Sequence, residues 1–365
     1  MTEPGHYMRR ALRLALRGRG KVSPNPLVGA VLVRGGRIVG EGAHLQVGGP
    51  HAEVNAFARA GAKARGADLY VTLEPCSCHG RTPPCTDAVL DAGVKRVFCA
   101  MQDPDARVAG RGFAKLRKAG LEVAVGLCAE EAHKLNAAYI KHRTQNLPLV
   151  LLKLAQTLDG RIAAKGGDAR WITGAKARRH VHRWRSWVDA IVVGAGTVVA
   201  DDPQLTVRHV KGRDPRPIVV DGCLRSSPAA QVYRRPGAIL VTAEKTPARK
   251  RQAYADQGAE VWTFPARAGR IDLRLPLSRA AQEGMTTVLI EGGGELAAAA
   301  LADQVVDQIQ LYLAPLLMGT GVEAIGDLGV EHAAEAIHLT AVHTRRLGAD
   351  LLYTAEVQYA CSPDS

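Results

Sequence analysis

Two short stretches near the start of the chain carry residue types that can bind a metal and move protons. The first is His51-Ala52-Glu53, and the second runs from Glu74-Pro75-Cys76 to Cys85. One histidine and two cysteines can hold Zn²⁺ and leave its fourth position to water, as in catalytic zinc sites. A glutamate next to the histidine can stay off the metal and transfer protons. The pattern therefore predicts a zinc-dependent deaminase of amino-heterocycles.

Glu53 would supply the proton transfers that hydrolytic deamination needs. Water is too weak a nucleophile at neutral pH, and Zn²⁺ lowers the pKa of its bound water from about 15.7 to roughly 7. A carboxylate beside the metal can take that proton and pass it to the ring nitrogen and the leaving amine. The alternative is a structural zinc site, which is normally closed by four protein ligands. The full set of residues favours the catalytic site.

The spacing of the cysteines departs from the usual Pro-Cys-x-x-Cys form. Position 79 is a histidine, and the cysteines that follow Cys76 are Cys78 and Cys85. Cys76 and Cys78 are too close to make an easy tetrahedral pair, so we expect Cys85 to be the third ligand. This leaves His79 as a spare donor and Cys78 as a thiol in the loop near the site.

Length and charge limit the classes of function. The chain has 365 residues, enough for two domains that each have a core. Its formal net charge of +13 favours an anionic partner, which could be a phosphorylated metabolite, NADP or nucleic acid. The charges form no long run of like residues, so nucleic-acid binding is the weaker interpretation. No apolar run approaches the ~18 residues of a membrane span, and we expect no membrane association.

The cysteines indicate a reducing compartment. The chain has seven, an odd number, and three of them cluster at positions 76, 78 and 85. Metal ligation explains this better than a disulfide framework. Residues 1–21 are amphipathic and rich in arginine, without the uninterrupted apolar centre of a signal peptide. We therefore expect a cytoplasmic protein.

Apolar periodicity places the zinc motifs at the ends of strands and helices. Helical spacing from 51 to 61 puts the histidine and glutamate of the first motif at a helix N-terminus. Residues 69–73 are typical of a strand that ends at the second motif, with a helix after Cys85 and a strand at 97–101. This alternation predicts an α/β layer with the site at strand ends.

The second half has a different set of signals. The polar stretch 141–146 is interpreted as a linker, which gives domains of residues 1–145 and 146–365. A helix is expected to start at Thr173 as its N-cap. Gly292-Gly293-Gly294 lies between a strand and a helix, where bare backbone N–H groups can approach a phosphate, although a simple tight turn is an equal alternative. Further strands are expected at 149–154, 191–193, 217–220, 288–290, 309–313 and 351–357.

Several motifs surround the zinc residues. They are Pro24-Asn25-Pro26-x-Val28-Gly29, His51-Ala52-Glu53-Val54, Thr72-Leu73-Glu74-Pro75-Cys76-Ser77, Gly80-Arg81-Thr82-Pro83-Pro84-Cys85, Met101-x-Asp103-Pro104 and Val108-Ala109-Gly110-x-Gly112. Together they closely resemble the bifunctional deaminase/reductase family of riboflavin biosynthesis. The segment from Gly80 to Cys85 separates that family from cytidine, tRNA-adenosine and guanine deaminases.

The resemblance implies a fold and a set of roles for the first domain. That domain would be a cytidine-deaminase-like three-layer αβα domain acting on a diaminopyrimidinone ribosylamino phosphate, a phosphorylated pyrimidine. One Zn²⁺ per chain would be held by His51, Cys76 and Cys85, with Glu53 as the proton donor. The residues implied to line the substrate are Asn25, His44, Arg81 and Asp103.

Further motifs resemble the reductase domain of the same family. They are Leu154-Ala155-x-Thr157-Leu158-Asp159-Gly160-Arg161-Ile162-Ala163, Trp171-Ile172-Thr173, Thr197-x-x-x-Asp201-Asp202-Pro203 and Glu291-Gly292-Gly293. The resemblance implies a dihydrofolate-reductase-like α/β domain that uses NADPH to reduce the ribosyl group of the deaminated product to ribityl.

Reductase residues follow by position from this resemblance. Those implied to meet NADPH are Gln156, Trp171, Thr197, Asp201, Gly222, Gly293, Gly294 and Glu295. Those implied to meet the substrate are Lys153, Arg185, Leu205, Arg208 and Glu291. The two arginines suit its phosphate, and Lys153 is the candidate for positioning or protonating the opened sugar. Trp171 could equally be a core aromatic, Arg185 a solvated helix residue and Lys153 a surface lysine.

Departures from the family pattern and alternatives remain. The family usually has His where Cys78 stands, Asn where Asp105 stands and often Ser where Ala169 stands. A second hypothesis is a zinc deaminase of another nucleobase or of nucleic acid with an unrelated C-terminal domain. A third is a zinc-stabilised binding module without turnover. By analogy with the family we also expect a homo-oligomer, a dimer or tetramer.

Overall fold

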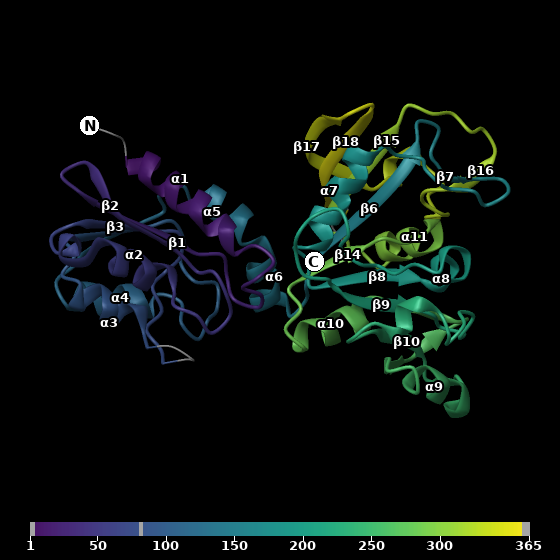
Figure 1. The fold of residues 1–365 in the computed structure, drawn as a ribbon, viewed down its shortest axis with the longest axis horizontal. Helices are drawn as coiled ribbons and strands as arrows, with labels where there is room; N and C mark the ends of the chain where they lie inside the picture. The colour runs from purple at the N-terminus through teal and green to yellow at the C-terminus, as the bar shows by residue number, and fades with distance from the viewer. Residues whose placement is uncertain (1–3, 80–82, 360–365) are drawn as a thin grey trace. The chain divides into compact units, whose positions relative to one another are not determined.

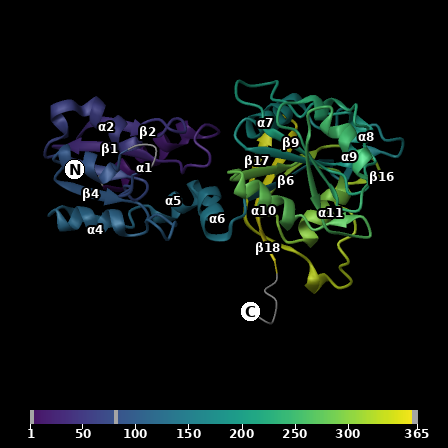
Figure 2. The same cartoon turned by 90° about the horizontal axis from the view of Figure 1, so that it is seen from below.

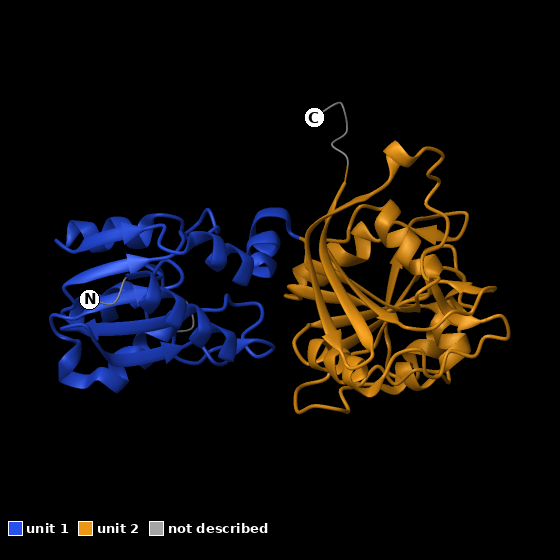
Figure 3. Ribbon diagram, turned by 90° about the horizontal axis from the view of Figure 1, so that it is seen from above, with its two compact units in different colours: residues 1–146 blue, residues 147–365 orange. Residues whose placement is uncertain are grey.

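The computed structural model describes residues 4–79 and 83–359, which form two compact units. One unit comprises residues 1–146 and the other residues 147–365 (Figure 3). Each unit has a β-sheet of mixed parallel and antiparallel strands that is flanked by helices, and each has buried apolar clusters of its own. Among the described residues, no helix combines the length and apolar character that a membrane crossing would require.

The first unit is built on a five-stranded sheet in the order β2-β1-β3-β4-β5. Strands β1 (Gly29–Arg34) and β2 (Arg37–Ala43) form an antiparallel hairpin. Strand β3 (Asp68–Val71) pairs antiparallel with β1 and parallel with β4 (Arg96–Cys99). Strand β5 (Glu122–Val125) is parallel to β4.

Helices cover both faces of this sheet, because β1 and β3 are apolar on both sides. In β1, Leu32 packs into the cluster under one helix layer, whereas Val31 and Val33 pack into the other. Figure 1 shows the two layers. One comprises α2 (Ala52–Ala60), α3 (Cys85–Asp91) and α4 (Arg111–Lys118), and the other comprises α1 (Pro4–Ala15), α5 (Ala129–Leu135) and α6 (Ala137–Gln145).

The polar stretch 141–146 differs from the linker that we expected. Residues 141–145 form the end of helix α6, and Asn146 caps it in the left-handed conformation. Tyr139 is the buried residue of this helix. With one buried side chain, the helix lacks the apolar stripe by which a sequence pattern reveals a helix.

The second unit has a nine-stranded sheet in the order β11-β10-β9-β8-β14-β6-β15-β18-β17. Its first seven members in this order are mutually parallel, and the last two pairings are antiparallel. The strands are β6 (Leu149–Thr157), β8 (Ala190–Gly194), β9 (Arg216–Val220), β10 (Ile239–Ala243), β11 (Glu260–Phe264), β14 (Thr287–Ile290), β15 (Gln308–Ala314), β17 (His338–Leu347) and β18 (Asp350–Gln358).

Helices again cover both faces of this sheet (Figure 2). Helices α10 (Arg274–Gln282) and α11 (Gly294–Ala302) pack on one face. The other face carries α7 (Ala175–Arg185), α8 (Ala195–Asp201) and α9 (Ala248–Ala255). Two short antiparallel strand pairs, β7 (Arg161–Ala164) with β16 (Gly321–Glu323) and β12 (Ala266–Arg267) with β13 (Arg270–Ile271), complete the unit.

Helix α7 starts later than its sequence predicted. Its N-cap is Gly174 rather than Thr173. The Gly174 N–H donates to Oδ2 of Asp350 at 2.8 Å, so a distant carboxylate satisfies the start of the helix. A local Thr cap is therefore not needed here.

Candidate active site

The predicted zinc ligands come together at the ends of three elements in the first unit. His51 is the N-cap of α2, Cys76 follows strand β3, and Cys85 is the first residue of α3. The imidazole Nδ1 of His51 lies 3.0 Å from Sγ of Cys85 and 3.6 Å from Sγ of Cys76. All three ligand atoms lie within 4.8 Å of one another.

This triangle fits a tetrahedral zinc ion. Zn–N and Zn–S bonds of about 2.0 and 2.3 Å place ligand atoms about 3.5 Å apart. The backbone N–H of Cys85, at the start of α3, donates to Sγ of Cys76 at 3.3 Å. Hydrogen bonding with Cys85, and then with His51, lowers the pKa of the Cys76 thiol to about 4. This shift favours the thiolate of Cys76, the form that binds a metal.

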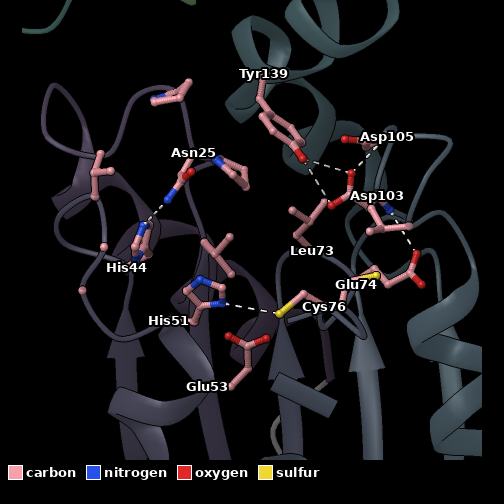
Figure 4. A pocket seen from close by; sticks show the side chains of 18 of the residues that line it. Asn25, His44, His51, Glu53, Leu73, Glu74, Cys76, Asp103, Asp105 and Tyr139 are labelled. Carbon is pink, nitrogen blue, oxygen red and sulfur yellow. Dashed lines mark hydrogen bonds between the residues drawn. The ribbon is translucent and has the colours of Figure 1, made fainter. Parts of the chain in front are cut away.

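Glu53 lies beside this triangle. It belongs to the first turn of α2 and is 3% exposed. Its carboxylate lies close to His51 and Cys76 (Figure 4). Burial raises the pKa of Glu53 above that of an ordinary glutamate. A raised pKa makes this carboxylate a better proton acceptor than an ordinary glutamate.

A cavity of about 450 Å³ opens in front of these residues. Asn25, His44 and Asp103, three predicted substrate residues, line it together with His51 and Glu53. The fourth predicted substrate residue, Arg81, lies outside the described residues. Figure 4 shows Asn25, His44, His51, Glu53 and Asp103 around the cavity.

His44 fixes the orientation of Asn25. Its Nδ1 lies 3.1 Å from the carbonyl oxygen of Pro50, which can only accept, so Nδ1 carries the proton. Burial lowers the pKa of His44, which favours the neutral ring with Nε2 as an acceptor. The amide Nδ2 of Asn25 donates to Nε2 at 3.0 Å. The amide oxygen of Asn25 is therefore the atom that this side chain offers to a ligand.

Asp103 is held by Tyr139, which the sequence reasoning missed. The Tyr139 hydroxyl donates to Oδ1 and Oδ2 of Asp103 at 3.1 and 3.3 Å. The N–H of Asp105 also donates to Oδ1. Asp105 itself lines the cavity, and its bond with Arg107 lowers its pKa to about 2. The carboxylate that replaces the family's Asn is thus already paired.

Glu74 organises the loop that carries Asp103. It is 5% exposed, and its carboxylate accepts four backbone N–H groups. Oε2 accepts those of Asp103 and Gly110 at 3.2 and 2.9 Å, and Oε1 accepts those of Gly112 and Phe113 at 2.8 and 3.3 Å. A Cβ at Gly112 would lie 2.1 Å from the carbonyl oxygen of Pro75, so this close approach requires glycine. The motif pattern contained Glu74 but gave it no role.

Cys78 and His79 also line the cavity. The cluster of three ligand atoms contains Cys85 rather than Cys78. The Cys78 thiol is exposed, as a loop thiol near the site would be.

In the second unit, Lys153, Arg185 and Glu291 form a buried charge cluster. Leu152 of β6 pairs with Ile290 of β14, so Lys153 and Glu291 extend from neighbouring strands. Nε and Nη2 of Arg185 donate to the two oxygens of Glu291 at 2.7 and 2.9 Å. Nζ of Lys153 is 3.8 Å from Oε2 of Glu291. Arg185 is thus an ion-paired residue with 13% of its side chain exposed, not a solvated one.

This cluster sets the charge of its members. Burial alone would raise the pKa of Glu291, but Arg185 and then Lys153 outweigh it and lower the pKa to about 2. Burial lowers the pKa of Lys153 below that of an ordinary lysine, against the opposing attraction of Glu291. The carboxylate is therefore permanently charged near neutral pH, and the lysine gives up a proton more easily than in water.

The predicted cofactor residues lie mainly where parallel strands end. Strand β8 leads into α8 at Gly194, and β14 leads into α11 through Gly293, the N-cap of that helix. A Cβ at Gly293 would lie 3.9 Å from Oγ1 of Thr197, so the two turns meet. Helix N-termini at such strand ends offer backbone N–H groups to phosphates.

The other predicted cofactor residues are more scattered. Asp201 is four residues after Thr197 on α8, hence on the same face, and Gln156 lies near the end of β6. Trp171 is 66% exposed and stacks with Arg178 at 4.5 Å, so it is not a core aromatic. Gly294 and Glu295 begin α11.

Gly222 has a packing reason for being glycine. It follows β9, and a Cβ there would lie 2.2 Å from the carbonyl oxygen of Gly269. This close approach explains the residue without a cofactor.

The remaining predicted substrate residues lie in the loop after α8. Arg208 is exposed, and its Nη1 donates to Oε1 of Gln204 at 3.2 Å. The side chain of Leu205 is 3% exposed and packs with Val198 and Val219. A substrate contact by Leu205 would therefore have to come from its backbone.

Comparisons with known proteins agree across both units. A model of the cytidine and deoxycytidylate deaminase zinc-binding region matches residues 1–101, and one of the RibD C-terminal domain matches residues 148–353. The riboflavin biosynthesis protein RibD of Aquifex aeolicus is 40% identical over 95% of this chain and 96% of its own. That of Escherichia coli is 40% identical over 95% and 97%. The chain belongs to the RibD family.

Solved structures of RibD family members share the fold of the whole chain. Acinetobacter baumannii RibD matches with a TM-score of 0.88 and 36% identity over 97% of this chain and 98% of that one. A diaminohydroxyphosphoribosylaminopyrimidine deaminase/5-amino-6-(5-phosphoribosylamino)uracil reductase from Thermotoga maritima matches with a TM-score of 0.82 and 35% identity over the same shares.

Family membership confirms several predictions from the sequence. The chain combines a cytidine-deaminase-like N-terminal domain with a RibD-type reductase domain, and it is a bifunctional deaminase and reductase of riboflavin biosynthesis. The hypothesis of an unrelated C-terminal domain was wrong, because residues 148–353 match the RibD C-terminal domain. The zinc-binding character of the first unit is likewise supported by the family match and by the ligand triangle.

Proposed function

We propose that the two units carry out successive reactions. The unit of residues 1–146 hydrolytically deaminates 2,5-diamino-6-(5-phosphoribosylamino)pyrimidin-4(3H)-one. The unit of residues 147–365 then reduces the ribosyl side chain of the product, 5-amino-6-(5-phosphoribosylamino)uracil, to ribityl with NADPH. The observation that carries the first step is the triangle of His51, Cys76 and Cys85 with the buried carboxylate of Glu53 beside it.

Deamination depends on proton transfer by Glu53. When bound, Zn²⁺ supplies Lewis-acid activation of a water molecule. Glu53 accepts a proton from the attacking water and delivers it to the ring nitrogen; it then takes a second proton, from the hydroxyl group of the adduct, and delivers it to the amine, which leaves as ammonia. Its raised pKa suits both directions of transfer. The amide oxygen of Asn25 and the carboxylate of Asp103, held by His44 and Tyr139, orient the heterocycle by accepting its N–H groups.

Reduction depends on orientation and on one proton. When bound, NADPH supplies the reducing equivalents, and its phosphates suit the turns at Gly194 and Gly293. Glu291 holds Arg185 and Lys153 in place. The ammonium group of Lys153, with its lowered pKa, donates a proton to the opened sugar. Arg185 and Arg208 bind the substrate phosphate through their guanidinium groups.

The proposal also covers the cellular setting. Two cysteine ligands must stay reduced to bind zinc, which suits the cytoplasm. We expect a homo-oligomer that binds no nucleic acid. Light scattering tests the assembly, and titration with labelled RNA and DNA tests the absence of nucleic-acid binding.

The decisive experiment follows NADPH oxidation after addition of the diaminopyrimidinone substrate to native and Glu53→Gln protein. We expect oxidation by the native enzyme alone, because reduction waits for deamination. Supplying the deaminated compound should restore oxidation in the variant. Ammonia release at the native rate by the variant would refute the role of Glu53. No oxidation by the native enzyme with the deaminated compound would refute the reductase assignment.

A further inference from the structure

In the loop of residues 204–208, every residue has a backbone group that is hydrogen-bonded to a side chain from another part of the unit. Arg235 Nη1 donates to the carbonyl oxygens of Gln204 and Leu205 at 3.2 and 2.8 Å. Leu205 has a φ of 53°, in the left-handed region that a branched residue avoids. These contacts hold the first half of the loop in a conformation that it would not adopt alone.

The second half of the loop is anchored from two sides. Arg185 Nη1 donates to the carbonyl oxygen of Thr206 at 3.0 Å, and the N–H of Val207 donates to Oδ1 of Asp214 at 2.7 Å. The N–H of Arg208 donates to Nδ1 of His182 at 3.0 Å. Helix α7 thus contacts the loop through Arg185, which the proposed function uses, and through His182, which it does not.

The donor in this last bond fixes the protonation of His182. A backbone N–H can only donate, so Nδ1 must be unprotonated and the ring proton must be on Nε2. His182 is 5% exposed, and burial, then Arg185 and His209, lower its pKa to about 4 despite the opposing Glu291. The imidazole is therefore neutral, and its Nδ1 accepts the hydrogen bond from the N–H of Arg208.

His182 connects the buried charge cluster to the exposed arginine. Arg185 and Glu291 lie close enough to influence the titration of His182, and so does Arg208. The guanidinium of Arg208 reaches Gln204, a residue of the same exposed loop. The hydrogen bond to His182 thus fixes the backbone position from which the long side chain of Arg208 extends.

We propose that His182 is a positioning residue of the reductase site, which holds the backbone of Arg208 so that its guanidinium meets the substrate phosphate. The inference rests on the proposed function of the second unit. His182 has no contact with the reacting atoms in this proposal. Its effect is on substrate binding through Arg208, more than on the chemical step.

The test compares His182→Leu with His182→Asn. Leucine removes the acceptor, whereas the amide oxygen of asparagine can occupy nearly the position of Nδ1. We expect His182→Leu to raise the KM for the deaminated substrate about tenfold, the value of one hydrogen bond in a binding site, with a smaller change in kcat. The KM for NADPH should stay within about twofold, because no cofactor residue is moved. His182→Asn should recover most of the loss.

His180→Asn is the matched control. His180 lies on the same helix and is half-buried, but its Nδ1 bonds to the hydroxyl of Tyr312 instead of the loop. It should leave the KM for the deaminated substrate unchanged. Ammonia release by the first unit reports that each variant remains folded there, and tryptophan fluorescence reports on the second unit.

The outcomes separate the two proposals. If the native enzyme does not oxidise NADPH, the reductase assignment fails. Calorimetric titration with the deaminated, phosphorylated substrate then still decides the role of His182. Weaker binding to His182→Leu than to the native protein supports that role. A native KM and affinity in His182→Leu would overturn the inference. The inference would also be overturned if His182→Leu lowered kcat and raised the KM values of both substrates to the same extent and His182→Asn did not restore them. That result would mean that His182 has a merely structural role.

Discussion

The two units each bury a glutamate at their site, and the environments of these residues act in opposite directions. Glu53 lies next to a histidine and a thiolate, and burial raises its pKa. Glu291 forms ion pairs with Arg185 and Lys153, which lower its pKa to about 2. The difference lies in the neighbouring cations. A buried carboxylate without a paired cation can exchange protons, whereas one with two cations is a fixed anchor for them.

The largest expected effect comes from Glu53→Gln. Glutamine keeps the shape but cannot transfer protons, so the rate of ammonia release should fall by about 10²- to 10⁴-fold. Zinc content by atomic absorption should stay at one per chain, because Glu53 is not one of the three ligands. Loss of zinc from the variant would show that the comparison is wrong and that Glu53 helps to hold the metal.

Glu291→Gln should mainly reduce stability. It leaves Arg185 and Lys153 buried without their counter-charge, which should cost about 3–5 kcal/mol in the free energy of unfolding. All four tryptophans, at positions 171, 184, 187 and 262, lie in the second unit, so their fluorescence during urea unfolding measures this unit.

The matched control for this variant is Glu295→Gln. The side chain of Glu295 is 89% exposed, so its loss should change stability by less than about 0.5 kcal/mol. Equal effects of the two substitutions would contradict the anchoring role of Glu291.

The anchoring role also predicts a pH dependence. The folded state lowers the pKa of Glu291 from its ordinary value of 4.5 to about 2. Its contribution is therefore complete above pH 4.5 and is lost as the pH falls towards 2. The loss should be roughly 3 kcal/mol. Urea midpoints by tryptophan fluorescence between pH 6 and pH 2 measure it, and the slope should be shallower in Glu291→Gln. Identical slopes would refute the pairing.

A smaller effect is expected from Glu74→Gln. One carboxylate oxygen becomes an NH₂ group, which faces two backbone donors instead of accepting from them. The Asp103 loop should shift, and kcat/KM for deamination should fall about tenfold. Reduction of the deaminated compound should be unchanged. A fall in both activities would indicate that Glu74 supports more than its own site.

The sequence predicted the chemistry-bearing residues better than the contacts that hold them. His51 and Cys85 stand at helix starts and Cys76 follows a strand, positions that apolar periodicity reveals, and the structure brings the three together. The four N–H groups that Glu74 accepts come from residues 29 to 39 positions away, so no local pattern indicates them. The contact between His182 and the N–H of Arg208 is invisible for the same reason.

Some elements were missed because their burial is slight. Helix α9 presents Tyr254 as its buried residue, and α6 presents Tyr139, so neither has an apolar stripe.

Strand β10 was missed for a different reason: it is buried at every position and is a short apolar run that we did not predict. Such a run is ambiguous without its neighbours, because periodicity cannot separate a short buried strand from a buried helix.

The strand order of the second unit has a consequence for how the chain is made. Strand β6 is the first strand of this unit to leave the ribosome, but its partners β14 and β15 are synthesised after more than a hundred further residues. Pairings of such long range form slowly and late. The zinc ligands, in contrast, are all complete by residue 85. The first unit can therefore fold during synthesis, while β6 of the second unit waits until β14 and β15 have been made.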